Sequence, residues 1–274
     1  MKPSSVSVIF TTYNSPAWLE KVLWGFFAQD TKAFEIVVAD DGSTIETRAL
    51  LDRMRKISPV PIRHVWQEDD GFQKCRILNK AIAAATGEYL IFTDGDCIPR
   101  ADFISQHLRF AAPGRFLSGG YFKLPLDISQ AITEEDVKAQ RPFDLAWLKS
   151  LGLKASIKNL KISAKGRWAD WLNAVSRTKA TWNGHNASCH KEAIVAVNGF
   201  DERMQYGGQD VEFGDRLTHH GLKGLRIRYS VICVHLDHGR GYVTDEMLRH
   251  SLSIRQATRA SRVVRAPLGL DQYL

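Results

Sequence analysis

The sequence has few cysteines, and none of them is paired at a spacing that marks a zinc or redox site. The four cysteines of this 274-residue chain are Cys75, Cys97, Cys189 and Cys233. Metal-binding and redox-active cysteines usually come in closely spaced pairs. Each of the four lies in or beside an apolar run, so we expect buried free thiols, as in a reducing cytosol.

The sequence also has no apolar run of transmembrane length. Its first residues, MKPSSVSVIFTTYN, lack the length and the cleavage-site pattern of a signal peptide. We therefore expect a cytoplasmic protein. Peripheral attachment to the inner face of the cytoplasmic membrane is an open alternative.

Two common phosphate-binding motifs are missing as well. No glycine-rich dinucleotide fingerprint follows the first predicted strand, and no loop ends in the Gly-Lys-Ser/Thr of P-loop enzymes. These absences argue against a NAD-dependent enzyme and against a P-loop NTPase. The formal net charge of +7 favours an anionic partner, which could be a nucleotide phosphate, an anionic lipid or glycan, or a nucleic acid.

Short apolar runs alternate with helical patterns through the first third of the chain. The predicted strands cover residues 6–10, 34–39, 62–66 and 89–92, and the predicted helices cover residues 16–28, 45–56 and 73–85. This alternation is typical of βαβ units. It predicts an α/β fold with a Rossmann-like, mostly parallel central sheet and helices on both faces.

Polar side chains follow three of these strands, within residues 11–14, 40–43 and 94–96. The carboxyl ends of parallel strands meet at one edge of a sheet, where ligands bind in such folds. Asp94 and Asp96, one glycine apart, suit a hard divalent cation, and Mg²⁺ or Mn²⁺ held there can neutralise a diphosphate. A turn followed by a helix cap would use the same residue types.

The same strand ends carry a resemblance to a known family. The stretches TTYN (11–14), ADDGS (39–43) and TDGDC (93–97) resemble family 2 glycosyltransferases of the GT-A fold, which are inverting enzymes that use nucleotide-diphosphate sugars. The stretch from Gly184 to Leu217 resembles the C-terminal half of β-1,4-galactosyltransferases and bacterial chondroitin-type polymerases. The resemblance covers residues 5–125 and 182–240.

The resemblance implies a donor site and a metal site. Asp96 would bind Mn²⁺ or Mg²⁺ directly, Asp94 would face the ribose or the metal shell, and His235 would be a further metal ligand, with His238 in reserve. The other implied donor-binding residues are Thr11 and Tyr13 beside the nucleoside, Asp40 on the base, and Phe72, Lys74 and Arg76 along the nucleotide and its phosphates. A solvated helix face is the alternative for Lys74 and Arg76.

The resemblance also implies a general base. In the stretch Gly207-Gly208-Gln209-Asp210, the aspartate would deprotonate the acceptor hydroxyl opposite the leaving phosphate. Gln209 stands where the family has glutamate, which puts the acceptor in doubt. Helix capping is the alternative role for Asp210. The implied acceptor-binding residues are Tyr121, Trp182, Gly208 and Gln209, the aromatic ones through stacking on sugar.

Two segments depart from the family pattern. Residues 126–182 form a basic, tryptophan-rich helical insertion, and residues 245–274 form a basic helical tail. The flanking residues 1–125 and 183–244 would then be the nucleotide-sugar half and the acceptor half. Basic amphipathic helices with tryptophan favour an anionic membrane surface. A lid over the acceptor cleft or a dimer contact are the alternatives.

These observations favour a metal-dependent inverting glycosyltransferase. Its donor would be a nucleotide sugar, with UDP favoured, and its acceptor a glycan or lipid-linked glycan such as a lipopolysaccharide core, capsule or exopolysaccharide unit. A nucleotidyltransferase on a similar sheet is one alternative, although TTYNSPAW is not its basic glycine-rich loop. A non-enzymatic protein that binds nucleic acid or another anionic polymer is the other. We expect no nucleic-acid partner, because acids at the strand ends would repel phosphate.

Overall fold

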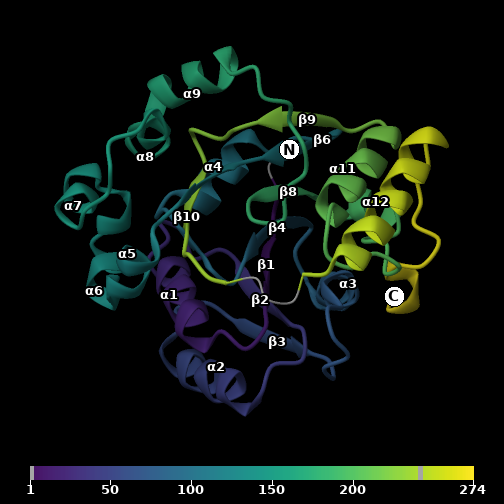
Figure 1. The fold of residues 1–274 in the computed structure, drawn as a ribbon, viewed down its shortest axis with the longest axis horizontal. Coiled ribbons are helices and arrows are strands. Elements are labelled where there is room, and N and C mark those ends of the chain that lie inside the picture. The colour runs from purple at the N-terminus through teal and green to yellow at the C-terminus, as the bar shows by residue number, and fades with distance from the viewer. Residues whose placement is uncertain (1–2, 240–242) are drawn as a thin grey trace.

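The computed structural model describes residues 3–239 and 243–274 (Figure 1). Most of the described chain is built around a seven-stranded sheet with the strand order β3-β2-β1-β4-β8-β6-β9. Its strands are β1 (Val6–Thr12), β2 (Glu35–Asp40), β3 (Ile62–Trp66), β4 (Tyr89–Asp94), β6 (Arg115–Ser118), β8 (Ala187–His190) and β9 (Lys223–Arg226). A three-stranded sheet in the order β5-β10-β7 contains β5 (Cys97–Pro99), β7 (Gly120–Lys123) and β10 (Ile232–His235).

The first four strands of the large sheet are parallel, as the alternating pattern predicts. β1 pairs with β2 on one side and with β4 on the other, and β3 pairs with β2. β8 runs antiparallel to β4 and connects it to the parallel pair β6 and β9. The expectation of a mostly parallel central sheet is therefore confirmed.

Successive residues of β1 point into two different cores. Val8 and Phe10 belong to one apolar cluster, while Ile9 belongs to the other. The first cluster is covered by α1 (Pro16–Phe27) and α2 (Ile45–Ile57), and the second by α3 (Lys74–Ala84), α10 (Lys191–Ala196) and α11 (Gln209–His219). Strands buried on both faces explain the continuous apolar runs of the sequence.

Residues 126–175 form a run of short helices that extends from the α1 side of the molecule (Figure 1). Apolar residues of this segment, among them Ile128, Val137 and Leu148, join the first cluster. The helices of the segment are α5 (Leu126–Ala131), α6 (Glu134–Lys138), η1 (Arg141–Phe143), α7 (Leu145–Ser150), η2 (Ile157–Asn159), α8 (Leu160–Ser163) and α9 (Gly166–Val175), while α4 (Phe103–Phe110) precedes it.

The C-terminal segment packs beside α11 (Figure 1). It consists of α12 (Asp245–Ala260) and the short helix η3 (Leu270–Gln272). A buried ion pair on α11, Glu212 with Arg216, accepts a hydrogen bond from Thr258 of α12. The segment is thus part of the acceptor half's packing.

Candidate active site

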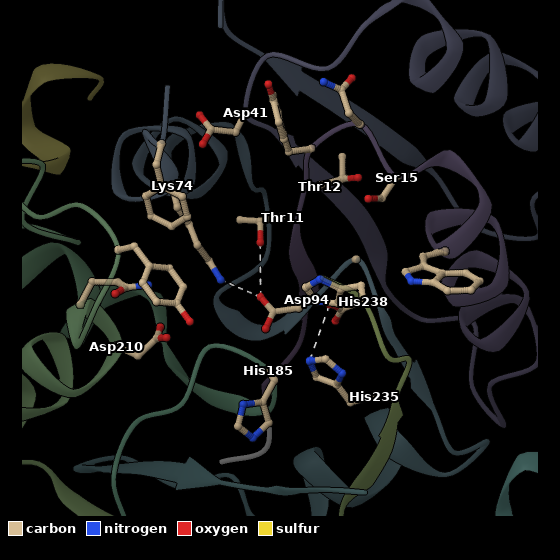
Figure 2. Close-up of a pocket in the computed structure, with 18 of the residues that line it drawn as sticks. Thr11, Thr12, Ser15, Asp41, Lys74, Asp94, His185, Asp210, His235 and His238 are labelled. Carbon is tan, nitrogen blue, oxygen red and sulfur yellow. Dashed lines mark hydrogen bonds and ion pairs between the residues drawn. The ribbon is translucent and has the colours of Figure 1, made fainter. Parts of the chain in front are cut away.

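The carboxyl ends of β1, β2 and β4 open into a cavity of about 730 Å³ (Figure 2). The opposite wall comes from the loop before α11 and from the end of β10, which lie more than a hundred residues later in the chain. The fold therefore brings the two halves of the motif pattern into one site, as expected for an open α/β sheet.

Lys74 and Asp94 form the centre of this site. Asp94 ends β4 beside Thr11 of β1, and Lys74 is the first residue of α3. Lys74 Nζ donates to Asp94 Oδ1 over 2.7 Å, and Thr11 Oγ1 donates to the same oxygen over 3.3 Å (Figure 2). Burial alone would raise the pKa of Asp94, but the charge of Lys74 outweighs it and lowers the pKa to about 2.

Asp96 faces two histidines, His235 at the end of β10 and His238 three residues later. Its Oδ2 lies 2.8 Å from His238 Nε2 and 3.6 Å from His235 Nε2. The Nδ1 atoms of His235 and His238 lie 2.8 Å from the carbonyl oxygens of Leu236 and Gly239. A carbonyl only accepts, so each Nδ1 carries a proton, and Nε2 is the ring nitrogen that each histidine turns toward the carboxylate.

A proton on Nε2 or a cation between the groups would each make these contacts attractive. One carboxylate with two imidazoles is a ligand set that suits Mn²⁺ and related divalent ions. The thiol of Cys97 lies beside the same group, and its ligand atom lies within 4.8 Å of those of Asp96 and His235. The residues present therefore fit a divalent metal.

Asp210 is held at the start of α11 on the far side of Lys74 from β1 (Figure 2). The two glycines before it adopt positive φ angles of 113° and 87°, which bring the helix start to the cavity. A Cβ atom at position 184 would lie 2.7 Å from Asp210 Oδ1, so Gly184 leaves room for the carboxylate.

The environment of Asp210 makes its carboxylate basic. Burial, together with the charge of Asp94, raises its pKa, while Lys74 and the backbone amide of Gly184 oppose the rise. Its Oδ1 has no hydrogen-bond partner among the described residues. Such a carboxylate can accept the proton of a hydroxyl that enters the cavity.

Most residues expected at the site line this cavity, and a few do not. The expected residues that line it are Thr11, Tyr13, Phe72, Lys74, Asp94, Asp96, Tyr121, Gly208, Gln209, Asp210, His235 and His238. The ring of Tyr13 is exposed and donates its hydroxyl to Asp69 over 2.9 Å. The Phe72 ring packs edge-to-face on Tyr206.

Asp40 lies behind the cavity, which is a correction to its expected contact with the base. It is buried within β2, where its carboxylate bonds His64 over 2.8 Å and the backbone N–H of Ser43 over 2.9 Å. The next residue, Asp41, lines the cavity. Burial raises the pKa of Asp41 to about 6, although hydrogen bonds from Gln67 and Gln73 oppose the rise.

Arg76 and Trp182 also lie away from the cavity. Arg76 points into a separate hollow of about 470 Å³ beside Asp69 and Asp70. Trp182 is 1% exposed and packs edge-to-face on Phe92, so it has no free face for a sugar. Stacking by Trp182 was therefore a wrong expectation, since its apolar surface completes the second core cluster.

Sequence reasoning missed the role of Asp41, and it placed His185 only as one residue of the stretch 182–186 that we expect to form part of the acceptor floor. His185 lines the cavity and packs on the Tyr121 ring at 4.4 Å between centroids. Burial lowers the pKa of His185 to about 4, so the ring is neutral near pH 7. The pair Asp40-Asp41 gave the signal for Asp41, but the sequence does not say which carboxylate faces the ligand. His185 gave no distinct signal beyond its place beside Gly184.

Among residues 3–239 and 243–274, no helix combines the length and apolarity needed to cross a membrane.

Comparison with known proteins agrees with this geometry. Residues 7–122 match the family model described as glycosyl transferase family 2. Over 235 residues the chain is 29% identical to the validoxylamine A glucosyltransferase of Streptomyces hygroscopicus subsp. jinggangensis (strain 5008), covering 79% of this chain and 52% of that protein. Over 229 residues it is 27% identical to the chondroitin synthase of Pasteurella multocida (strain Pm70), covering 79% of this chain and 23% of that protein. The chain thus spans about half the length of the first relative.

Solved structures share the fold at lower identity. S. aureus TarS 1–349 in complex with UDP-GlcNAc superposes with a TM-score of 0.63 at 16% identity, covering 98% of this chain and 69% of that one. The mannosyltransferase PcManGT from Pyrobaculum calidifontis, in complex with GDP-Man and Mn²⁺, superposes with a TM-score of 0.60 at 21% sequence identity. This match covers 97% of this chain and 66% of that one. Together with the family match over residues 7–122, these likenesses confirm the resemblance to glycosyl transferase family 2 and the GT-A fold.

Proposed function

We propose that the chain is a metal-dependent, inverting glycosyltransferase. It moves a sugar from a nucleotide-diphosphate donor, with a UDP-sugar favoured, to a hydroxyl of a growing surface glycan. One observation carries the proposal: a carboxylate–histidine cluster at Asp96 that fits a divalent cation and a buried carboxylate at Asp210, whose Oδ1 has no partner among the described residues, line the same cavity, and Lys74 lies between them. A transferase needs these groups together, for the leaving diphosphate and for the attacking hydroxyl.

The nucleotide would lie along the ends of β1 and β2. Tyr13 and Phe72 offer aromatic faces for the base and ribose, and Asp41 takes the role first assigned to Asp40, accepting from a base N–H. Lys74 would move from Asp94 to the diphosphate when the donor enters. UDP is favoured because the TarS structure holds UDP-GlcNAc, although PcManGT holds GDP-Man.

The metal would be held by Asp96 with His235 and His238, and Asp94 would orient the ribose or the metal's water shell. Mn²⁺ or Mg²⁺ bound there would neutralise the charge that develops on the departing diphosphate. Mn²⁺ is favoured over Mg²⁺ because two of the three groups are imidazoles. The Mn²⁺ in the PcManGT structure supports the same choice.

Asp210 would take the acceptor's proton as the hydroxyl attacks the anomeric carbon from the face opposite the leaving group. This single displacement inverts the configuration at that carbon. Gln209, Gly208 and Tyr121 line the wall beside Asp210 and would contact the acceptor. The relatives that make polysaccharide, such as the chondroitin synthase, support a glycan acceptor from a lipopolysaccharide core, capsule or exopolysaccharide. We place this reaction in the cytoplasm, where such units are assembled on lipid.

The proposal is tested by incubating the full chain with Mn²⁺ and a panel of UDP-, GDP-, dTDP- and CDP-sugars, with lipid-linked and free glycan fractions as acceptors. Release of one nucleotide that depends on both metal and acceptor, with a product of inverted anomeric configuration by NMR, is expected. Product of retained configuration would contradict the role of Asp210. Transfer of a nucleotidyl group to a sugar phosphate would contradict the reaction class.

A further inference from the structure

The positive charge of the chain is concentrated in one segment. Residues 141–182 contain nine Lys and Arg residues against two Asp, a net charge of +7 that equals the formal charge of the whole chain. The rest of the chain is therefore balanced. Such an asymmetry marks a surface for an anionic partner.

Neither acid of this segment offsets the lysines. Asp144 caps α7 by accepting from the backbone N–H of Ala146. Asp170 pairs with Arg109 of α4 and accepts from Ser230. Lys154, Lys158 and Lys165 are exposed. The excess of positive charge therefore faces solvent.

Large apolar side chains share this exposed surface. Trp168 and Trp171 of α9 are 50% and 52% exposed and stack on each other at 4.9 Å, with Val175 one turn further along. Ile157, before α8, is 84% exposed. We call residues 154–175 the tryptophan–lysine surface. Figure 1 shows α8 and α9 at the outer edge of the molecule, away from the central sheet.

One lysine of this surface contacts the wall of the candidate active site. Lys161 of α8 donates to the carbonyl oxygen of Tyr121 over 3.2 Å and lies 5.3 Å from the centroid of its ring. Tyr121 lines the cavity. A molecule anchored at the tryptophan–lysine surface would therefore have its polar end near the cavity rim.

The C-terminal segment shares these properties only in part, since Leu248 and Leu252 of α12 are 40% and 48% exposed. Arg259 pairs with Asp215, and Arg265 pairs with Asp271, so acids of this chain already neutralise two of the arginines expected to face lipid. Its Ser251 and Thr258 are buried. These ion pairs make the tail a weaker candidate for lipid binding than the tryptophan–lysine surface.

We propose that the tryptophan–lysine surface docks the enzyme on an anionic membrane, with the tryptophans at the headgroup level and the lysines over anionic phosphates. Interfacial binding of this kind combines buried apolar area with attraction to acidic lipids. The inference rests on the proposed function in one respect, because a lipid-linked acceptor gives the docking a purpose. Binding to lipid itself can be measured without donor, metal or acceptor.

The test is co-sedimentation of the full chain with vesicles of phosphatidylcholine alone and with phosphatidylglycerol added. We expect binding only to the anionic vesicles. The variant Lys154→Glu/Lys158→Glu/Lys165→Glu should bind about a hundredfold more weakly, as three near-surface charges imply. The variant Trp168→Ser/Trp171→Ser should also bind more weakly.

A matched control carries the same charge change elsewhere. The variant Arg48→Glu/Lys56→Glu/Lys223→Glu reverses three exposed charges outside the segment and should bind within about twofold of the wild type. Equal binding to both vesicle types, or equal loss in the two triple variants, would overturn the inference. So would a dimer, seen by sedimentation velocity, that Trp168→Ser/Trp171→Ser abolishes while vesicles are not bound, since the surface would then belong to a second copy.

The two proposals fail separately. If nucleotide does not raise the melting temperature but the chain still binds vesicles, the result counts against the proposed transferase site alone. An intact rise without vesicle binding would overturn the docking surface alone.

Discussion

Lys74 Nζ lies 2.7 Å from Asp94 Oδ1, so the cation that should bind the donor's phosphates is paired with a carboxylate of the same site. The pair lowers the pKa of Asp94 and raises that of Lys74 against the effect of burial. The lysine therefore stays charged throughout the pH range in which the enzyme would work. It is ready to move to a diphosphate, whose charge is larger than that of one carboxylate.

We expect Lys74→Met to weaken nucleoside-diphosphate binding at least about tenfold, the loss typical of one charge-assisted contact. The charge of Lys74 also lowers the pKa of Asp210, so its removal raises that pKa further. A base must be ionised, so the acidic limb of the kcat profile should move to higher pH. Lys74→Arg keeps the charge and should leave this limb in place. A profile that does not move in Lys74→Met would contradict the coupling.

Asp210→Asn should lower kcat by roughly a hundredfold to ten-thousandfold, the contribution typical of a general base. The affinity for the nucleotide should change little, because the proposal assigns Asp210 to the acceptor hydroxyl and not to the nucleotide. Asp215→Asn is the matched control on the same helix, where the carboxylate pairs with Arg259 instead of facing the cavity. Steady-state kinetics with both variants decide the matter. An active Asp210→Asn enzyme would remove the assigned base.

The free energy of unfolding should carry a signature of Asp41. Burial raises the pKa of this carboxyl from 3.8 to about 6, so the folded state holds its proton more tightly than the unfolded state. Stability contributed by the protonated form is therefore full below pH 4 and is lost as the pH rises through about 6.

In Asp41→Asn this loss should be absent. The variant should gain stability relative to the wild type between pH 4 and pH 8, by at most about 3 kcal/mol. Urea unfolding at both pH values measures the difference. If wild type and Asp41→Asn differ in free energy of unfolding by the same amount at pH 4 and at pH 8, Asp41 does not titrate as its burial implies.

The sequence predicts the sheet well because its strands are buried on both faces and its polar residues stand at strand ends. The sequence does not tell which of Asp40 and Asp41 lines the cavity. That choice depends on the fold, in which His64 binds the Asp40 carboxylate behind the cavity. The expectation that Trp182 stacks on a sugar was wrong because the sequence does not show which residues surround it in space. Its neighbours are polar in sequence, but Phe92 and Phe213 enclose it in space.

The burial of one ion pair was equally hidden from sequence reasoning. Glu212 and Arg216 are both fully buried on α11, with Arg216 donating to the carbonyl of Val197 over 2.6 Å. Oppositely charged residues four positions apart on a helix are typical of an exposed surface pair. In the fold they join α11 to α12 through Thr258 and so support the helix whose first turn carries Asp210.

Arg216→Met should lower the free energy of unfolding by about 3–5 kcal/mol, because it leaves the Glu212 carboxylate buried without its partner. The double variant Glu212→Leu/Arg216→Met removes both charges and should cost less. Arg259→Met breaks an exposed pair between the same two helices and should cost less than about 1 kcal/mol. Denaturant unfolding of the three variants gives the order. A double variant as unstable as Arg216→Met would argue against an unpaired buried charge as the cause.

The most direct test of the central claim is the melting temperature with UDP, GDP, dTDP and CDP, each with and without Mn²⁺. Ligand at a hundred times its dissociation constant adds roughly 2.7 kcal/mol to the folded state. We expect one nucleotide, most readily UDP, to raise the melting temperature only when Mn²⁺ is present. The rise should vanish in Asp96→Ala and persist in His220→Ala, whose exposed histidine lies at the end of α11. A rise that needs no metal, or that survives Asp96→Ala, would contradict the metal site, and no rise with any nucleotide would contradict the donor site.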